Sequence, residues 1–433
     1  MMYYSTNKNA DRATLQEAVV KGLASDRGLF MPDVIKQLPE DFFENMKDLS
    51  FQEIAYVVAD AFFGEDVDAA SLKEIVYDTL NFDVPLIHVH DNIYSLELFH
   101  GPTLAFKDVG ARFMSRLLGY FIKKEGQKEV NVLVATSGDT GSAVANGFLG
   151  VDGIRVYVLY PKGKVSPIQE CQFTTLGKNI TALEVDGVFD DCQALVKSAF
   201  MDKDLNAHMK LTSANSINVA RFLPQAFYYF YAVAQLHKLG IKKDIVICVP
   251  SGNFGNITAG LFGKRMGMPV KRFIAANNRN DIFFQYLNTG VYTPRPSVQT
   301  IANAMDVGDP SNFARILDLY GNSHETISAE IAGRTYTDEQ IADSLRECYK
   351  THGYLMDPHG SVGYRALMEL LQPGESGVFL ETAHPAKFKE TVEEIMKDEV
   401  AIPTKLQEFM KGTKQSVQMS KEFADFKAYL LQQ

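Results

Sequence analysis

The chain has 433 residues, of which 46% are hydrophobic and 22% are charged, and this composition is typical of globular proteins without long disordered tracts. Its length fits two or three domains with separate apolar interiors. Asp and Glu outnumber Lys and Arg by 53 to 43, and the net charge of -10 argues against a nucleic-acid or anionic-membrane surface, so any anionic ligand must be held locally.

Two further features bear on where the protein works. Residues 1–12 are polar and lack the apolar core of a signal peptide, and no apolar run is long enough to span a membrane. The cysteines form no C-x-x-C pair, which argues against a disulfide framework or a zinc knuckle; they are Cys171, Cys192, Cys248 and Cys348. We therefore expect a cytoplasmic protein with reduced thiols.

The first 80 residues have a helical pattern. Apolar residues recur at three- and four-residue spacing over Phe51–Phe63 and again between Leu72 and Leu80. We expect residues 1–80 to form a helical N-terminal domain.

After this region the sequence changes to short β-rich runs, each followed by a turn and a helical segment. Strands that alternate with helices indicate right-handed βαβ units and a largely parallel, doubly wound sheet. After Lys405 the sequence predicts only a surface helix or tail. The expected strands are Val130–Ala135, Ile154–Tyr160, Ile180–Val185, Asp244–Val249, Arg272–Ala276 and Gly377–Glu381.

Ligands of open parallel sheets bind beyond the carboxyl ends of the strands, so the loops at those ends carry the most information. Residues 251–256, Ser-Gly-Asn-Phe-Gly-Asn, lie between an expected strand and an expected helix. Glycines allow the backbone to approach a ligand closely, and the free N–H groups of the next helix bind phosphate. A plain strand-to-helix turn is an equally good interpretation, and neither G-x-G-x-x-G nor a P-loop motif occurs.

A second loop, Thr-Ser-Gly-Asp-Thr-Gly at residues 136–141, occupies the same kind of position. Its hydroxyls and main-chain N–H groups are suited to a carboxylate or phosphate. Taken alone, helix capping by Asp139 or Thr140 explains it better.

A third segment, Glu97–Arg112, places Lys107 after a Gly-Pro turn and the apolar residues 104–106. Apolar neighbours lower the proton affinity of a lysine, and a neutral amine is required to form a Schiff base with an aldehyde. A solitary lysine is usually a solvated charge, so the surrounding sequence must decide between the two interpretations.

The surrounding sequence resembles one family. Residues 100–108, HGPTLAFKD, are similar to the cofactor-lysine segment of the threonine synthases, which are fold type II pyridoxal-phosphate (PLP) enzymes. Tyr4–Asn7 and Gly28–Pro32 resemble the family's N-terminus. The later motifs follow in the family's order and extend the resemblance over nearly the whole chain: TSGDTG, Asn215–Arg221, SGNFGN and Glu381–Lys387.

The resemblance implies an α/β fold with two doubly wound, largely parallel sheet domains and a helical N-terminal domain. The implied ranges are a small α/β domain over 99–210, a large PLP-binding domain over 81–98 and 211–405, and a C-terminal helix or tail over 406–433.

The resemblance also implies where pyridoxal phosphate is held. Lys107 would form the Schiff base and act as the catalytic base, Thr382 would lie at the pyridine nitrogen, and Asp139 would lie near the phenolic oxygen. A neutral hydroxyl at the pyridine nitrogen favours elimination over transamination. The phosphate of PLP would be held by the turn residues Gly252, Asn253, Phe254, Gly255 and Asn256.

The implied substrate is O-phospho-L-homoserine, which is converted with water to L-threonine and phosphate. Ser216 and Arg221 would bind the substrate phosphate, with Thr136, Ser137 and Thr140 nearby, because an Arg fork matches a phosphate bidentately. From spacing alone, Arg221 is better explained as part of a surface ion pair. A threonine deaminase, a β-replacing synthase, or a ligand-binding protein that lost its chemistry would share parts of this pattern.

The histidines do not indicate a metal site. His88 and His90 alternate along one expected strand, but no third ligand at suitable spacing accompanies them, so we expect no metal. Hydrogen bonding within turns explains His100 and His384 as well as catalysis does. We further expect a monomer or homodimer, no nucleic-acid partner and no membrane partner.

Overall fold

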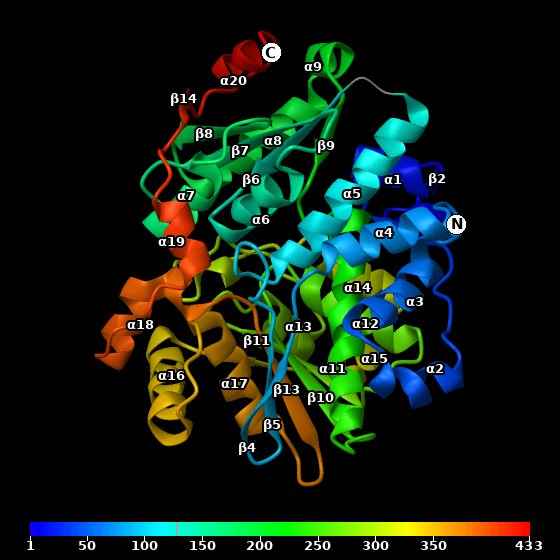
Figure 1. Ribbon diagram of the computed structural model, residues 1–433, viewed down its shortest axis with the longest axis vertical. Coiled ribbons are helices and arrows are strands. Elements are labelled where there is room, and N and C mark those ends of the chain that lie inside the picture. The colour runs from blue at the N-terminus through cyan, green and yellow to red at the C-terminus, as the bar shows by residue number, and fades with distance from the viewer. Residues whose placement is uncertain (127–128) are drawn as a thin grey trace. The chain divides into compact units, whose positions relative to one another are not determined.

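The computed structural model describes residues 1–126 and 129–433, which divide into two compact units. Each unit contains one mostly parallel sheet with helices packed against it (Figure 1), so the expected α/β fold class is confirmed. Unit 1 consists of Met1, Met31–Phe106 and Phe222–Ala401, and unit 2 consists of Met2–Phe30, Lys107–Arg221 and Ile402–Gln433.

The sheet of unit 1 has six strands in the order β12-β11-β10-β13-β5-β4. All neighbouring pairs are parallel except β4 and β5, which are antiparallel. The strands are β4 (Leu86–His90), β5 (Ile93–Glu97), β10 (Ile245–Pro250), β11 (Arg272–Asn277), β12 (Ile331–Thr335) and β13 (Ser376–Glu381).

The helices of unit 1 lie between and beyond these strands. They are α2 (Glu40–Asn45), η1 (Met46–Asp48), α3 (Phe51–Phe63), α4 (Ala69–Thr79), η2 (Leu223–Gln225), α11 (Ala226–Lys238), α12 (Gly255–Arg265), α13 (Ile282–Thr289), η3 (Asn303–Met305), α14 (Phe313–Leu319), α15 (His324–Glu330), α16 (Asp338–His352), α17 (Pro358–Leu370), η4 (Pro385–Phe388) and α18 (Lys389–Met396).

Alternate residues of β10 point to opposite faces of the sheet, and all of them are buried. Val246 and Cys248 belong to a buried cluster that includes residues of α16 and α17. The centre of the sheet is buried on both sides, which explains why its strands are continuous apolar runs.

The sheet of unit 2 has five strands in the order β14-β8-β7-β6-β9, all parallel. The strands are β6 (Val130–Ala135), β7 (Ile154–Pro161), β8 (Ile180–Asp186), β9 (Leu211–Ser213) and β14 (Val417–Ser420). The same unit contains the antiparallel pair β1 (Met2–Ser5) and β2 (Ala13–Thr14), and the short β3 (Phe30–Pro32) crosses the boundary between the units.

The helices of unit 2 are α1 (Leu15–Lys21), α5 (Lys107–Glu125), α6 (Asp139–Phe148), α7 (Pro167–Thr174), α8 (Phe189–Met201), α9 (Lys203–His208), α19 (Thr404–Met410) and α20 (Phe423–Leu430), and α10 (Val219–Phe222) ends at the boundary. Leu133, Leu159 and Leu183 from neighbouring strands pack with residues of α8 and α20 in one buried cluster.

The structure agrees with the expected strands to within a residue or so and adds several that the sequence did not predict. The region after Lys405, expected as a helix or tail, contains β14 as an edge strand of the unit 2 sheet. Residues 1–80, expected as one helical domain, also contain β1, β2 and β3 and are divided between the units. The four domain ranges themselves stay a prediction.

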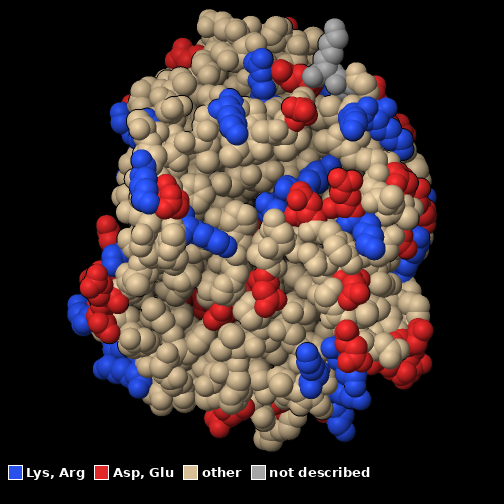
Figure 2. All heavy atoms as spheres, in the orientation of Figure 1, with Lys and Arg blue, Asp and Glu red and all other residues tan. Residues whose placement is uncertain are grey.

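Within residues 1–126 and 129–433, none of the helices combines the length and apolarity that a membrane span requires. On the face seen in Figure 2, basic and acidic side chains are interspersed.

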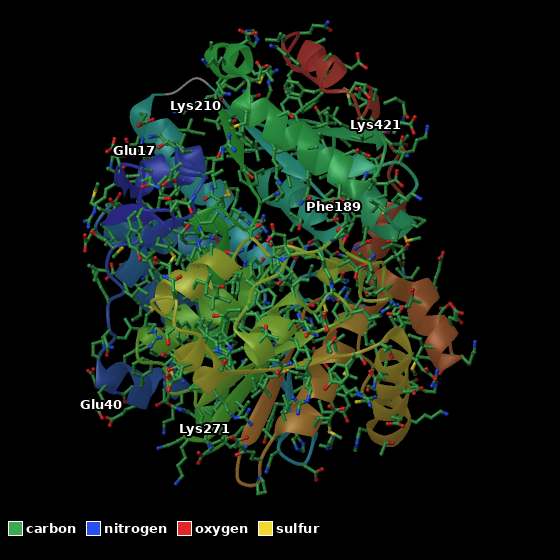
Figure 3. All side chains as sticks on the ribbon, turned by 180° about the vertical axis from the view of Figure 1, so that it is seen from behind. Glu17, Glu40, Phe189, Lys210, Lys271 and Lys421 are labelled. Carbon is green, nitrogen blue, oxygen red and sulfur yellow. The ribbon has the colours of Figure 1, made fainter. Side chains whose placement is uncertain are left out.

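A buried carboxylate joins the starts of two strands in unit 1. Glu375 is 1% exposed, and it accepts hydrogen bonds from Nε and Nη2 of Arg272 at 3.1 and 2.6 Å. Lys271, labelled in Figure 3, lies 3.1 Å from the same carboxylate. Burial alone would raise the pKa of Glu375, but the hydrogen bonds from Arg272, Gln372 and Lys271 lower it to about 2.

Glu375→Gln should lower the free energy of unfolding by about 1–3 kcal/mol at pH 7, because it weakens a bidentate, charge-assisted contact. A depressed carboxyl pKa stabilises the fold above the ordinary value of 4.5, and this contribution is lost as the pH falls towards 2. Urea unfolding of both proteins at pH 7 and pH 3 measures the effect. A difference in unfolding free energy between the two proteins that is the same at pH 3 as at pH 7, or larger, would contradict this explanation.

Candidate active site

Two loops of unit 1 leave the same edge of its sheet. Strands β10 and β13 are parallel neighbours, with Ile245 opposite Ser376 and Cys248 opposite Phe379. The turn at residues 251–256 follows β10, and Thr382 follows β13. Their strand register therefore brings together the residues expected at the phosphate and at the pyridine nitrogen of the cofactor.

The turn itself has the geometry of an anion site. Gly252 allows close backbone packing, since a Cβ there would lie 2.8 Å from the carbonyl oxygen of Ala304 and 2.9 Å from Cα of Met305. Phe254 adopts a left-handed conformation, with φ of 65°, and directly precedes α12. The turn is thus bent sharply into the N-terminus of an eleven-residue helix, whose positive end favours a phosphate.

Asn256 offers a donor to this turn. Its Oδ1 accepts hydrogen bonds from the hydroxyls of Tyr228 and Tyr229, both at 2.7 Å. Both tyrosines are fully buried, and burial raises their pKa well above the ordinary value, so the hydroxyls keep their protons as donors. The Nδ2 group of Asn256 is buried and has no hydrogen-bond acceptor within the described part of the chain, which fits the need for a bound oxygen anion.

Asn253 fastens the turn to a neighbouring segment. Its side-chain oxygen accepts from the backbone N–H of Ser311 at 2.7 Å, and its carbonyl accepts from that of Asn312 at 3.3 Å. These bonds hold the backbone of the turn in place, which is a positioning role for Asn253.

Thr382 lies in a buried part of unit 1, where the chain after β13 contacts residues 105 and 106. It is 7% exposed, and its carbonyl accepts a hydrogen bond from the backbone N–H of Phe106 at 2.9 Å. Leu104 and Ala105 are buried, and Ala105 forms an antiparallel bridge with Ala383. Lys107 follows Phe106 in the chain and is the first residue of α5 in unit 2.

In unit 2 the expected substrate residues also converge on one sheet edge. Strands β6 and β9 are parallel neighbours, with Asn131 opposite Leu211 and Leu133 opposite Ser213. The loop at residues 136–141 follows β6, and the segment that contains Ser216 and Arg221 follows β9. The register brings these two sequence-distant motifs to the same edge.

The loop after β6 is shaped by one hydroxyl. Oγ1 of Thr136 accepts from the backbone N–H groups of Gly138 and Gly141, at 2.9 and 2.8 Å. Oδ1 of Asp139 accepts from Nε2 of Gln169 at 2.9 Å. Thr136 therefore organises the loop, whereas Ser137 is exposed and Thr140 is half-buried. A ligand contact by any of these residues stays a prediction.

Arg221 is not on the surface. It is 2% exposed, and its Nη1 donates to the carbonyl oxygen of Ala214. Burial lowers the pKa of Arg221 to about 10, while the charge of buried Asp108 acts in the opposite direction, so the guanidinium stays cationic at neutral pH. The interpretation as a surface ion pair is wrong for this residue. A buried cation at this sheet edge is suited to bind a phosphate.

The two histidines of the motifs make short-range hydrogen bonds. Nε2 of His100 lies 2.7 Å from Oε2 of Glu97, and Nδ1 of His384 accepts from the backbone N–H of Ala386 at 3.0 Å. Burial, with a smaller effect of His100, lowers the pKa of His384 to about 4, so this ring is neutral near pH 7. These contacts are those of turn residues. Among the described residues, no three His, Cys, Asp or Glu side chains are grouped as metal ligands would be.

Several residues that shape the site could not be recognised from the sequence. Tyr228 and Tyr229 lie in a helical run that is apolar on all sides and reads as ordinary core. His359 accepts a hydrogen bond from the backbone of Ala304, 55 residues away, and a single His in a helix start gives no signal of that.

Taken together, the unit 1 turn fits the phosphate of pyridoxal phosphate. It combines the N-terminus of α12, a glycine that a side chain would block, and the unsatisfied amide of Asn256. Thr382 follows the neighbouring strand, where the opposite end of a bound cofactor is expected.

Family models match three parts of the chain, two of which overlap. Residues 83–380 match the pyridoxal-phosphate dependent enzyme family, residues 2–80 match the threonine synthase N terminus, and residues 360–430 match the threonine synthase C-terminal region.

Curated relatives match over the full length. Threonine synthase from Haemophilus influenzae is 44% identical over 432 residues, covering 100% of both chains. Threonine synthase from Escherichia coli is 44% identical over 408 residues, covering 94% of each chain.

Solved structures agree. The crystal structure of threonine synthase from Escherichia coli has a TM-score of 0.93 at 42% identity and covers 100% of both chains. The PLP-bound threonine synthase from Brucella melitensis has a TM-score of 0.94 at 33% identity, with coverage of 100% of this chain and 99% of that one. A threonine deaminase at 13% identity, with a TM-score of 0.53 over 72% of this chain, shares the fold alone.

The full-length similarity in sequence and in structure, together with the matched N-terminal and C-terminal regions, shows that this chain belongs to the threonine synthase family of PLP-dependent enzymes.

Proposed function

We propose that this protein catalyses the threonine synthase reaction, in which O-phospho-L-homoserine and water give L-threonine and inorganic phosphate, as the last step of threonine biosynthesis. The observation that carries the proposal is the 44% identity over essentially the whole chain to threonine synthase. The enzyme is then a PLP-dependent lyase that acts on a phosphate ester.

Lys107 is the residue proposed to hold the cofactor covalently through its side-chain amine. The turn at Gly252–Asn256 would bind the cofactor phosphate with main-chain N–H groups and with Nδ2 of Asn256. Thr382 would face the pyridine nitrogen and Asp139 the phenolic oxygen. When bound, PLP supplies an electron sink that stabilises negative charge at the substrate carbons.

The side chains of the protein supply the proton transfers. The substrate amine would displace the amine of Lys107 from the cofactor. The freed amine would then take the proton from the α-carbon and move a proton at the β-carbon. The neutral hydroxyl of Thr382 leaves the pyridine nitrogen without a carboxylate partner, which suits loss of a leaving group better than transamination.

Arg221 is proposed as the main cation for the substrate phosphate. Its burial means that the guanidinium meets a dianion with little competition from water, where charge-assisted hydrogen bonds are strongest. Ser216 and the loop residues Thr136, Ser137 and Thr140 would add hydroxyl contacts. A second phosphate site of this kind separates the proposal from a threonine deaminase or a β-replacing synthase, which need only the cofactor phosphate site.

The composition supports a proposal for the partners and the location of the enzyme. The substrate is a small molecule, and the acidic net charge of -10 provides no general attraction for nucleic acid. The cysteines are all free thiols among the described residues, with Cys192, Cys248 and Cys348 buried. We propose a cytoplasmic enzyme that works as a monomer or homodimer.

The product assay tests the reaction. Incubation of the PLP-loaded enzyme with O-phospho-L-homoserine should release phosphate and L-threonine in equal amounts, because each elimination is followed by addition of one water. Phosphate by colorimetry and threonine by chromatography measure the two products. Phosphate accompanied by a keto acid would indicate a different lyase.

Arg221→Ala should lower kcat/KM for O-phospho-L-homoserine by about 10²–10³-fold, since truncation of one partner of a buried charge pair costs about 2–5 kcal/mol. The cofactor absorbance should stay unchanged, because Arg221 is not proposed to touch PLP. Arg116→Ala on α5 is the control, since Arg116 is half-buried and donates to carbonyls within unit 2. Wild-type kinetics in Arg221→Ala would remove Arg221 from the substrate site.

A further inference from the structure

A cluster of buried titratable side chains lies behind the phosphate turn of unit 1. Asp357 and Glu381 are fully buried, and His359 is 2% exposed. Asp357 precedes α17, His359 lies in its first turn, and Glu381 is the last residue of β13. None of them has a part in the chemistry proposed above.

The hydrogen bonds fix the proton on His359. Its Nε2 accepts from the backbone N–H of Ala304 at 3.0 Å. The proton of the neutral ring is therefore on Nδ1, which donates to Oδ2 of Asp357 at 2.5 Å. His359 thus connects Asp357 to the backbone of Ala304.

The negative charge of the carboxyl pair lies on Asp357. Its Oδ1 accepts from the backbone N–H of Gly360 at 2.8 Å as the N-cap of α17, so it also faces the positive end of a thirteen-residue helix. Burial would raise the pKa of Asp357, but His359, Glu381 and Gly360 lower it overall. Asp357 is consequently the partner that stays ionised.

Glu381 is the partner that holds a proton. Its Oε1 accepts from the backbone N–H of Asp357 at 3.1 Å, whereas its buried Oε2 finds no donor among the side chains and backbone groups that the structure describes. Burial, followed by the charge of Asp357, raises the pKa of Glu381 well above its ordinary value. A proton on the carboxyl group of Glu381 removes the repulsion that a second negative charge would have with Asp357 in this buried space.

The cluster reaches both parts of the cofactor site in unit 1. Glu381 directly precedes Thr382, and its carbonyl accepts from the backbone N–H of Leu98 at 3.0 Å. At the other end, Ala304 is bound by His359, and its carbonyl would lie 2.8 Å from a Cβ at Gly252. One chain of hydrogen bonds and close packing therefore runs from Thr382 to the phosphate turn.

We propose that Glu381, through the hydrogen bond that it accepts from the backbone N–H of Asp357, is a positioning residue that fixes both Thr382 and, by way of His359 and Ala304, the phosphate turn at Gly252. The inference rests on the proposed cofactor site and adds residues to it. Loss of the proton would place two carboxylates side by side in a buried space, and their repulsion would separate the two ends of the chain of contacts.

Several titratable groups from other elements surround the carboxyl groups of Asp357 and Glu381. The hydroxyl oxygen of Tyr354 lies 2.8 Å from Oγ of Ser95 and 2.9 Å from Oε1 of Glu97. Burial, with the charges of Glu381 and Glu97, raises the pKa of Tyr354 well above its ordinary value. The titratable neighbours are Glu97 from β5, Tyr354 from the link between α16 and α17, His359 from α17, His384 from the start of η4 and, facing His359, Asp306.

The first test concerns the proton and uses the full chain without cofactor. Glu381→Gln keeps a neutral donor and acceptor but cannot ionise. A raised carboxyl pKa stabilises the fold below the ordinary value of 4.5, and this contribution is lost as the pH rises towards the folded pKa. As the pH rises from 5.5 to 7.5, the unfolding constant of wild type relative to that of Glu381→Gln should therefore increase, by up to about tenfold per pH unit for the one proton, measured by urea unfolding.

The second test concerns positioning and measures the dissociation constant of PLP by absorbance at pH 7. Glu381→Ala should weaken PLP binding at least tenfold, and Glu381→Gln should restore it to within threefold of wild type. Glu375→Gln is the matched control, because Glu375 is a buried acid just before the opposite end of β13, and it should leave PLP affinity within twofold of wild type.

The two tests distinguish the protonation of Glu381 from its positioning role. A pH-independent ratio of unfolding constants would overturn the protonated state of Glu381. Equal PLP affinity in wild type and Glu381→Ala would overturn the positioning role while leaving the proposed function intact. Failure of the wild-type protein to bind PLP would overturn both.

Discussion

Parallel strand register is the constraint on which the site depends. In unit 1, β10 and β13 are hydrogen-bonded neighbours, so the turn at residues 251–256 and Thr382 must leave the same edge. In unit 2, the pairing of β6 with β9 does the same for the loop at residues 136–141 and the segment that ends at Arg221. Each motif is ordinary alone, and the register makes each pair a possible ligand site.

Burial of charge then gives these edges their chemistry. Arg221 in unit 2 is shielded from water and stays cationic, which suits a phosphate leaving group. In unit 1, Asp357 remains ionised at a helix N-terminus while Glu381 retains a proton. In both units the sign of the charge is set by the neighbours that the fold supplies, namely Asp108 for the arginine and His359 with the start of α17 for the acid pair.

The sequence predicted the strands well where they are continuous apolar runs between turn residues. Val130–Ala135 matches β6 to the residue, and α3 coincides with the periodic stretch Phe51–Phe63, which has a Ser50 capping box. It missed β9 and β14, because strands of three and four residues carry too little pattern to identify. The C-terminal strand also depends on pairing with β8, a contact distant in sequence.

For the candidate site, the sequence identified the motifs but not the interactions within them. Spacing favoured a surface ion pair for Arg221, and only tertiary packing shows that this side chain is buried. Nor could it reveal that Tyr228 and Tyr229 orient Asn256, since neighbouring tyrosines in an apolar helix have the pattern of ordinary core. Hydrogen bonds between residues far apart in sequence leave no local signal.

The proposed function requires the amine of Lys107 to hold pyridoxal phosphate. Reduction of the PLP-loaded protein with borohydride, followed by proteolysis and mass spectrometry, tests it most directly, because reduction makes the linkage permanent. A pyridoxyl group on the peptide that contains Lys107, and on no other lysine peptide, is the expected result. A label on a different lysine, or no label on a protein saturated with PLP, would contradict this role of Lys107.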